Sequence, residues 1–98
     1  MGNYMITIDL PEVFTEKFVS RIPSQRQHIS KLLKQGIAVS YSLSFDRKKL
    51  WVVLAADSEA EVHTLINKFP IKNYIKYELC PLLFNETSLN TVPHLWLN

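Results

Sequence analysis

Hydrophobic and polar residues alternate at the start of the chain, and this alternation predicts a β-strand. Over residues 3–10 every second side chain is apolar, whereas the side chains between them mix apolar and polar groups. The apolar side carries Tyr4, Ile6, Ile8 and Leu10. We expect the strand to end at Pro11, because a proline has no amide hydrogen to give to a sheet.

Residues 15–35 have apolar positions three, four and seven apart, which is the spacing of an amphipathic helix. The apolar stripe carries Phe14, Phe18, Ile22, Ile29, Leu32 and Leu33. Gly36 follows as a cap in the left-handed conformation. Pro23 cannot donate a hydrogen bond to the carbonyl of Val19. We therefore expect either a kink at Pro23 or two helices, the second of which begins there.

Two more strands follow, joined by a short polar turn at residues 46–49. Residues 37–45 alternate between a large apolar side and a side of alanine and serine. The apolar side carries Ile37, Val39, Tyr41, Leu43 and Phe45. Residues 50–56 are apolar on both sides, which predicts a central strand that is covered on both faces.

A second helix is indicated by a capping box at Ser58 and Glu61, in which each side chain bonds the backbone amide of the other residue. Apolar side chains at helical spacing continue to Phe69, and Pro70 stops the helix. Residues 74–82 alternate again and predict the last strand.

The chain then changes character after residue 82. Residues 83–98 are rich in apolar side chains and carry one charge, Glu86. We therefore divide the chain into a domain over residues 1–82 and an apolar C-terminal tail over residues 83–98, which we expect to dock on a partner subunit.

The order strand, helix, strand, strand, helix, strand predicts an α+β fold of the ferredoxin-like βαββαβ type. In this fold both helices cover one face of a four-stranded antiparallel sheet. The other face would carry Met5, Thr7, Ser40, Ser42, Ser44, Trp51 and Glu78. This bare face, the apolar tail and the two-sided third strand together predict a homodimer or a larger homo-oligomer.

Composition limits the class of protein. The 98 residues suffice for one domain, and 47% hydrophobic with 20% charged residues is typical of a globular protein. No apolar run approaches the roughly 20 residues of a membrane-spanning helix, and we recognise no signal peptide, so we expect a cytoplasmic protein without membrane contacts. Cys80 is the only cysteine, and the three histidines lack the spacing of a metal site.

Charge is concentrated in the first half of the chain, although the net charge is only +2. Residues 17–49 carry eight basic side chains against a single acid, Asp46. A basic segment of this kind attracts anions, and we expect a small anionic organic ligand. No carboxylate side chain lies between Glu16 and Asp46.

The segment from Arg21 to Leu82 resembles the muconolactone isomerase family without gaps. The residues that carry the resemblance are Lys31–Gly36, Trp51–Ser58, His63, Phe69–Tyr74, Glu78 and Leu82. The resemblance implies a ferredoxin-like subunit that pairs into a dimeric α+β barrel. It also implies an enzyme that moves a proton on a small lactone carboxylate, without a cofactor or a metal.

Several side chains have the chemistry that such a reaction needs. Glu78 lies in a strand among apolar neighbours, where a carboxylate becomes a stronger base, and imidazoles titrate near neutral pH. The candidate catalytic residues are Glu78, His28 and His63. Arg26 can pair with a carboxylate, and aromatic side chains can line a cavity. The candidate substrate-binding residues are Arg26, Tyr41, Trp51 and Tyr74.

Two alternatives remain open at this point. The absence of acids over residues 17–45 favours a non-catalytic ligand-binding or assembly module of the same fold. RNA-recognition domains share this order of strands and helices, but they need stacking aromatics on the open sheet face. Trp51 is the single aromatic candidate there, so we do not expect nucleic acid as a partner.

Overall fold

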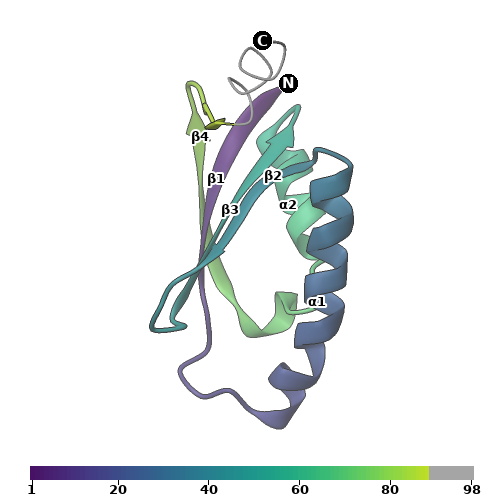
Figure 1. The fold of residues 1–98 in the computed structure, drawn as a ribbon, viewed down its shortest axis with the longest axis vertical. Coiled ribbons are helices and arrows are strands. Elements are labelled where there is room, and N and C mark those ends of the chain that lie inside the picture. The colour runs from purple at the N-terminus through teal and green to yellow at the C-terminus, as the bar shows by residue number, and fades with distance from the viewer. Residues whose placement is uncertain (89–98) are drawn as a thin grey trace.

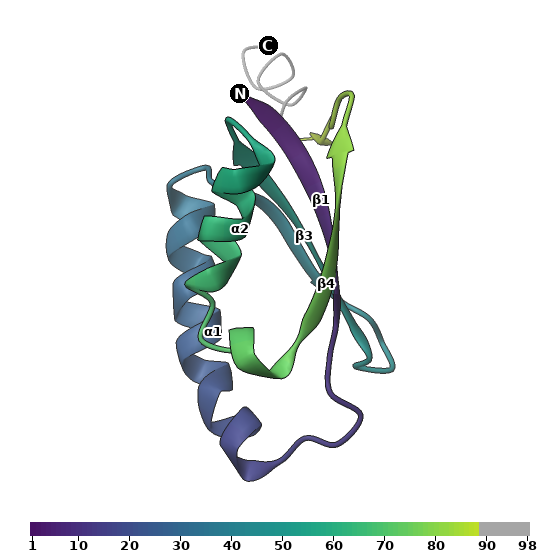
Figure 2. The same ribbon diagram turned by 180° about the vertical axis from the view of Figure 1, so that it is seen from behind.

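The computed structural model describes residues 1–88 and shows a twisted sheet with both helices on one of its faces (Figures 1 and 2). The strands are β1 (Gly2–Asp9), β2 (Ala38–Leu43), β3 (Lys49–Ala56) and β4 (Lys76–Leu82). The helices are α1 (Glu16–Lys34), α2 (Glu59–Asn67) and the short 3₁₀ helix η1 (Lys72–Tyr74). The predicted ferredoxin-like fold is therefore confirmed for the single chain.

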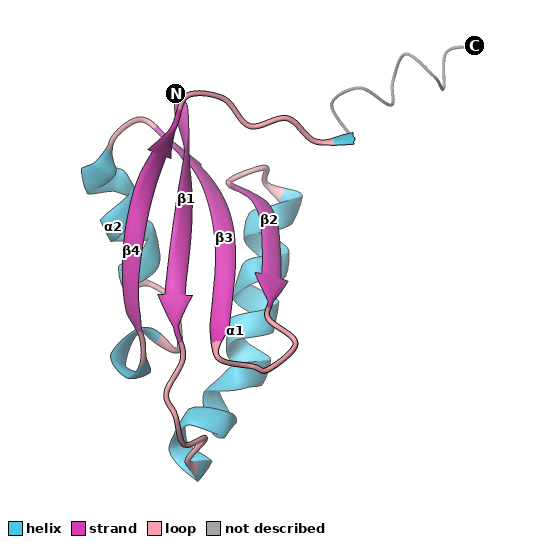
Figure 3. Cartoon of the chain, turned by 90° about the vertical axis from the view of Figure 1, so that its left-hand side faces the viewer, coloured by secondary structure: helices cyan, strands magenta, loops and turns pink. Residues whose placement is uncertain are grey.

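The sheet is antiparallel throughout, in the order β2-β3-β1-β4, as the face-on view in Figure 3 shows. Each strand turns alternate side chains to the helices and to the opposite, open face. Ile6 pairs with Val52 on one side and with Leu79 on the other, and all three face the helices. One residue further on, Thr7 stands between Trp51 and Glu78 on the open face.

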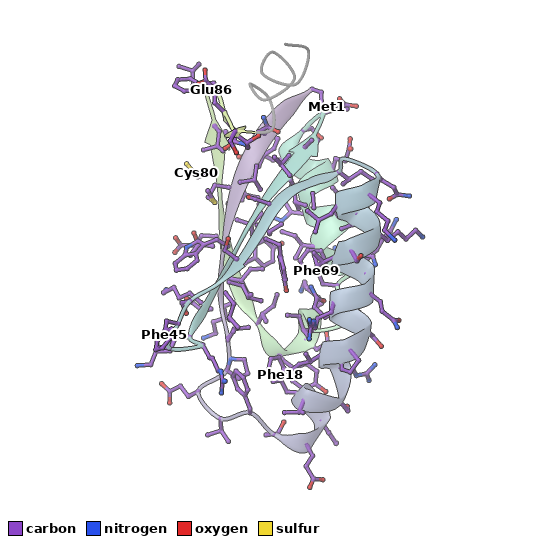
Figure 4. All side chains as sticks on the ribbon, viewed as in Figure 1. Met1, Phe18, Phe45, Phe69, Cys80 and Glu86 are labelled. Atoms are coloured by element: carbon purple, nitrogen blue, oxygen red, sulfur yellow. The ribbon has the colours of Figure 1, made fainter. Side chains whose placement is uncertain are left out.

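The hydrophobic core fills the space between the sheet and the helices. Figure 4 shows Phe18 and Phe69 in this space, whereas Cys80 projects from the open face. The core consists of Ile6, Ile8, Phe18, Ile29, Leu32, Ala38, Leu50, Val52, Leu54, Ala56, Val62, Ile66, Phe69 and Ile71. Each large apolar side chain buried in this way stabilises the fold by about 1.5–3 kcal/mol.

Helix α1 starts and ends at the predicted places. Its N-cap Thr15 accepts a hydrogen bond from the amide of Phe18 at 3.2 Å. At the other end, the amides of Gly36 and Ile37 donate to the carbonyls of Leu33 and Leu32, which is the Schellman arrangement. Gly36 has the left-handed φ of 73° that this motif requires.

Of the two alternatives expected at Pro23, a kink or two helices, the second is wrong, because α1 runs through Pro23 as one helix. Pro23 is exposed, and so is Val19, the residue whose carbonyl loses its helical donor. Water can therefore solvate that carbonyl. The packing of α1 on the sheet outweighs one missing hydrogen bond.

Strand β2 departs from the predicted alternation. Ala38 pairs with Leu54 and Ser40 with Val53, so the register shifts by one residue between Ala38 and Ser40. This β-bulge turns Ala38 into the core, where it is 2% exposed, in place of the larger Val39. Beyond the bulge the predicted pattern returns, and Tyr41 faces the helices.

The start of α2 is close to the prediction. Ser58 accepts from the amide of Glu61 at 3.2 Å. The Glu61 carboxylate, however, accepts from the amide of Asp57 at 3.4 Å and not from that of Ser58. Both side-chain bonds of a capping box therefore form at the start of α2, but the bond to Glu61 comes from the amide of Asp57, one residue before Ser58.

The open face carries most of the side chains predicted for it, with Met5, Thr7, Ser40, Ser42, Trp51 and Glu78 in register there. Within residues 1–88 no second layer covers this face. The prediction that the tail docks on a partner falls largely on residues 89–98, which lie outside the described part. None of the helices described is long and apolar enough to span a membrane.

Candidate ligand-binding site

A cavity of about 350 Å³ lies between the first half of α1 and the part of the sheet formed by β2 and β3. Apolar side chains from α1, both strands and the loops dominate its wall. The lining residues are Leu10, Phe14, Phe18, Ile22, Gln25, Arg26, Tyr41, Leu43, Leu50 and Ile71. This volume is at the lower end of the range in which proteins bind small organic ligands.

Aromatic packing shapes one end of the cavity. The ring of Phe18 makes edge contacts with Phe14 at 4.8 Å and with Tyr74 at 5.7 Å between centroids. Leu43 is 54% exposed although it lines the cavity. The cavity therefore reaches the surface beside an apolar side chain.

Gln25 is the one buried polar residue of the described chain and is only 3% exposed. Its Oε1 accepts a long hydrogen bond of 3.5 Å from the amide of Ile71. Its Nε2 has no hydrogen-bond partner within residues 1–88. An unpaired buried donor costs about 1–3 kcal/mol, so this amide group calls for a functional explanation.

Tyr41 lies beside Gln25 in the cavity wall. Burial raises the pKa of the Tyr41 phenol above its ordinary value of 10.0, and the Gln25 amide partly opposes this rise. Tyr41 therefore keeps its proton at neutral pH, and its hydroxyl can donate a hydrogen bond as well as accept one.

Arg26 completes the polar part of the lining. Its side chain is exposed, so the guanidinium remains hydrated. The structure thus brings together two of the four predicted binding residues, Arg26 and Tyr41, at one cavity.

The other predicted residues lie elsewhere. Glu78 and Trp51 flank Thr7 on the open face, on the side of the sheet away from the cavity. Glu78 is exposed, and Trp51 is 37% exposed. The apolar surroundings expected for Glu78 are therefore not formed within one chain.

The two histidines occupy two further places. His63 on α2 shares a hydrogen bond of 2.5 Å with the hydroxyl of Tyr77 on β4. His28 on α1 packs its ring edge-on against Phe69. Partial burial lowers the pKa of His28, and the positive charges of Lys31 and Lys68 lower it further. Neither histidine lines the cavity, and the three candidate catalytic residues do not form one cluster.

Tyr74 borders a second, wider depression at the end of the molecule that holds the β2–β3 turn. This groove has a volume of about 960 Å³ and mixes acidic and basic side chains. Two of them, Asp9 and Lys49, already pair with each other at 2.6 Å. Its charges are exposed and partly satisfied, so it is a weaker candidate than the apolar cavity.

Gln25 was not among the residues predicted from the sequence, although the sequence contains its signal. Gln25 lies three residues after Ile22 and four before Ile29, within the apolar stripe of α1. A glutamine at such a position is turned into the core. One polar residue within the apolar stripe of a helix is therefore the sequence feature that indicates the buried amide.

The part of the chain that the structure describes contains no group of three or more His, Cys, Asp or Glu side chains placed to hold a metal ion. Neither the known protein families nor the curated proteins include a match to this sequence.

Proposed function

We propose that the protein binds a small organic acid in the cavity between α1 and the sheet. The observation that carries this proposal is the cavity itself, which is apolar over most of its wall and has an arginine and a phenol at its polar side. An apolar cavity with a few convergent polar groups is the usual form of a small-molecule site.

Binding fits the lining better than the proton transfer implied by the muconolactone isomerase resemblance. A general base must lie within hydrogen-bond reach of the proton that it removes. Among the described residues that line the cavity there is no Asp, Glu or His. Tyr41 holds its proton more tightly than a free phenol does, which makes it a donor at neutral pH.

Arg26 supplies the preference for an acid. A guanidinium can bind a carboxylate through two parallel hydrogen bonds. Because Arg26 is exposed at the cavity wall, the carboxylate can stay partly hydrated while the apolar body of the ligand enters the cavity. The absence of acidic residues over positions 17–45 leaves this positive charge without a competing carboxylate in the segment that carries it.

The proposal is tested with 4-phenylbutanoate as a probe, followed by amide chemical shifts in NMR. We expect shift changes at residues around the cavity, and at least tenfold weaker binding to Leu43→Trp, whose larger side chain fills the opening. Leu33→Trp is the matched control, because Leu33 is 42% exposed on α1 but does not line the cavity. Equal binding to both variants would contradict the proposal.

The charge preference has its own test. Arg26→Ala is expected to weaken binding of 4-phenylbutanoate but not of the neutral 4-phenylbutanamide. Arg21→Ala removes an exposed arginine from the same helix away from the cavity and serves as the control. If both arginine variants lower the affinity for the acid equally, general electrostatic attraction is at work and Arg26 has no specific role.

We also propose that two copies of the chain pair through the open sheet face. Trp51 on β3 is 37% exposed on this face, and Met5 on β1 lies beside the nearly buried Val53, which is 2% exposed. Apolar side chains gathered on an uncovered sheet favour a self-complementary interface, in which the same patch meets itself across a two-fold axis.

A further inference from the structure

The orientation of the Gln25 amide determines which of its atoms is left for a ligand. The amide of Ile71 can only donate, so the atom of Gln25 that faces it is the oxygen. The nitrogen is then the free end of the side chain, and it has no partner within residues 1–88. A donor that is almost fully buried therefore stands in the wall of an apolar cavity.

Tyr41 provides a second donor beside the first. Gln25 and Tyr41 both line the cavity, and the Gln25 amide lies close enough to lower the pKa of the Tyr41 phenol. The Gln25 nitrogen has no hydrogen-bond partner within residues 1–88, so it and the phenol hydroxyl can both donate to one acceptor atom.

The chemistry of this pair limits the acceptor. Both donors are neutral, and the side chains around them are apolar. A carboxylate moved into such a wall would lose its hydration without gaining a positive partner, whereas a neutral carbonyl loses much less. Arg26, which is exposed, is the place for the negative charge.

We infer that the ligand is an acid with two polar ends: a carboxylate at Arg26 and a neutral ketone or amide carbonyl that accepts from Gln25 and Tyr41. The inference rests on the proposed function and adds the substrate class, namely oxo acids or N-acyl acids with an apolar body. Gln25 then distinguishes acids with this carbonyl from acids without it, which Arg26 alone would bind with equal affinity.

The experiment compares two acids that differ by one carbonyl group, 4-oxo-4-phenylbutanoate and 4-phenylbutanoate. Their dissociation constants are measured by NMR titration of the full chain. We expect the wild-type protein to bind the oxo acid about 3–10-fold more tightly, the gain typical of a neutral hydrogen bond. Without donors in the cavity, 4-phenylbutanoate would bind more tightly than the oxo acid, because the ketone would lose its hydrogen bonds to water without gaining a new one.

Gln25→Met is the main variant, since methionine has a similar length and no donor. It is expected to lose the preference for the oxo acid over 4-phenylbutanoate. Gln27→Met, at an exposed glutamine of the same helix that does not line the cavity, should keep the preference. Tyr41→Phe should reduce it, and this variant decides the question if Gln25→Met does not fold.

The outcomes separate the inference from the proposed function. If the wild type binds both acids equally well, or if Gln25→Met and Tyr41→Phe keep the preference, the inference is wrong while binding in the cavity stands. Equal binding would mean that Gln25 holds only a water molecule. If neither acid binds, the proposed function fails, and the inference fails with it.

Discussion

Buried and half-buried polar side chains at single positions are the most informative residues of this protein. Gln25 replaces one apolar side chain in the stripe of α1, and its amide spans from the η1 side of the core to the cavity. A leucine there would fill the same space without an unpaired donor. The residue is thus costly for folding alone, which is the reason to assign it to recognition.

His28 gives a prediction at the same scale. Its pKa is lowered by burial first and then by Lys31 and Lys68, so its NMR titration should have a midpoint below the ordinary 6.5. Removal of one positive neighbour by Lys68→Ala should raise the midpoint, and Lys72→Ala, which removes a charge outside this set, should leave it unchanged. A wild-type midpoint at or above 6.5 would contradict the packing of His28 described above.

The sign of the effect on stability follows from the same shift. The unfolded chain binds a proton at His28 more readily than the folded chain does, so the contribution of His28 is present above pH 6.5 and is lost as the pH falls. Thermal melting between pH 7.5 and 5.5 should therefore show a smaller decrease for His28→Gln than for the wild type.

At the scale of an element, the C-terminus of α1 depends on the backbone of one residue. Gly36 has a φ of 73°, and a Cβ built there would meet nothing within 4 Å. Gly36→Ala should therefore lower the free energy of unfolding by about 1 kcal/mol through backbone strain alone. Gly36→Asn should cost less, because asparagine tolerates this conformation.

Urea unfolding measures this difference, and the chain offers a matched control. Gly2, the other glycine, has no left-handed φ, and its nearest neighbour to a Cβ is a side-chain atom of Tyr4 at 3.9 Å. Gly2→Ala should leave the unfolding midpoint almost unchanged. If Gly2→Ala and Gly36→Ala lower the free energy of unfolding equally, the left-handed φ of Gly36 is not the cause of the loss.

The elements themselves were largely predictable, because periodicity and caps are local. Gly36 and Ser58 marked helix ends correctly. The bulge in β2 was not predictable, since neither Ala38 nor Val39 breaks a strand and the shift is set by pairing with β3. Continuity of α1 through Pro23 likewise depends on tertiary packing, which a local pattern does not contain.

At the scale of the whole molecule, the site was predictable only in part. Arg26 and Tyr41 meet at one cavity because α1 packs against β2. Glu78 was a candidate for the same reaction, but it lies on the open face, where the alternation of β4 had already placed it. A sequence gives the face of each residue within its own element, whereas the sharing of a cavity depends on how elements cross.

The open face leads to the last prediction, which concerns the assembly. If two copies pair through this face, Trp51 lies inside the interface, and Trp51→Glu places two negative charges against each other in apolar surroundings. We expect the wild type to elute as a dimer and Trp51→Glu as a folded monomer in size-exclusion chromatography with light scattering. The circular dichroism spectra of the wild type and Trp51→Glu should be alike, which shows that the variant is folded.

Phe45→Glu is the matched control for this change. Phe45 is fully exposed at the tip of the β2–β3 turn (Figure 4), beyond the last paired residues of these strands, Leu43 and Leu50. Like Trp51→Glu, the variant Phe45→Glu removes an aromatic side chain and adds a negative charge. A dimer formed through the open face should tolerate this change. A wild-type monomer would contradict self-association, and a dimer that survives Trp51→Glu would contradict pairing through the open face.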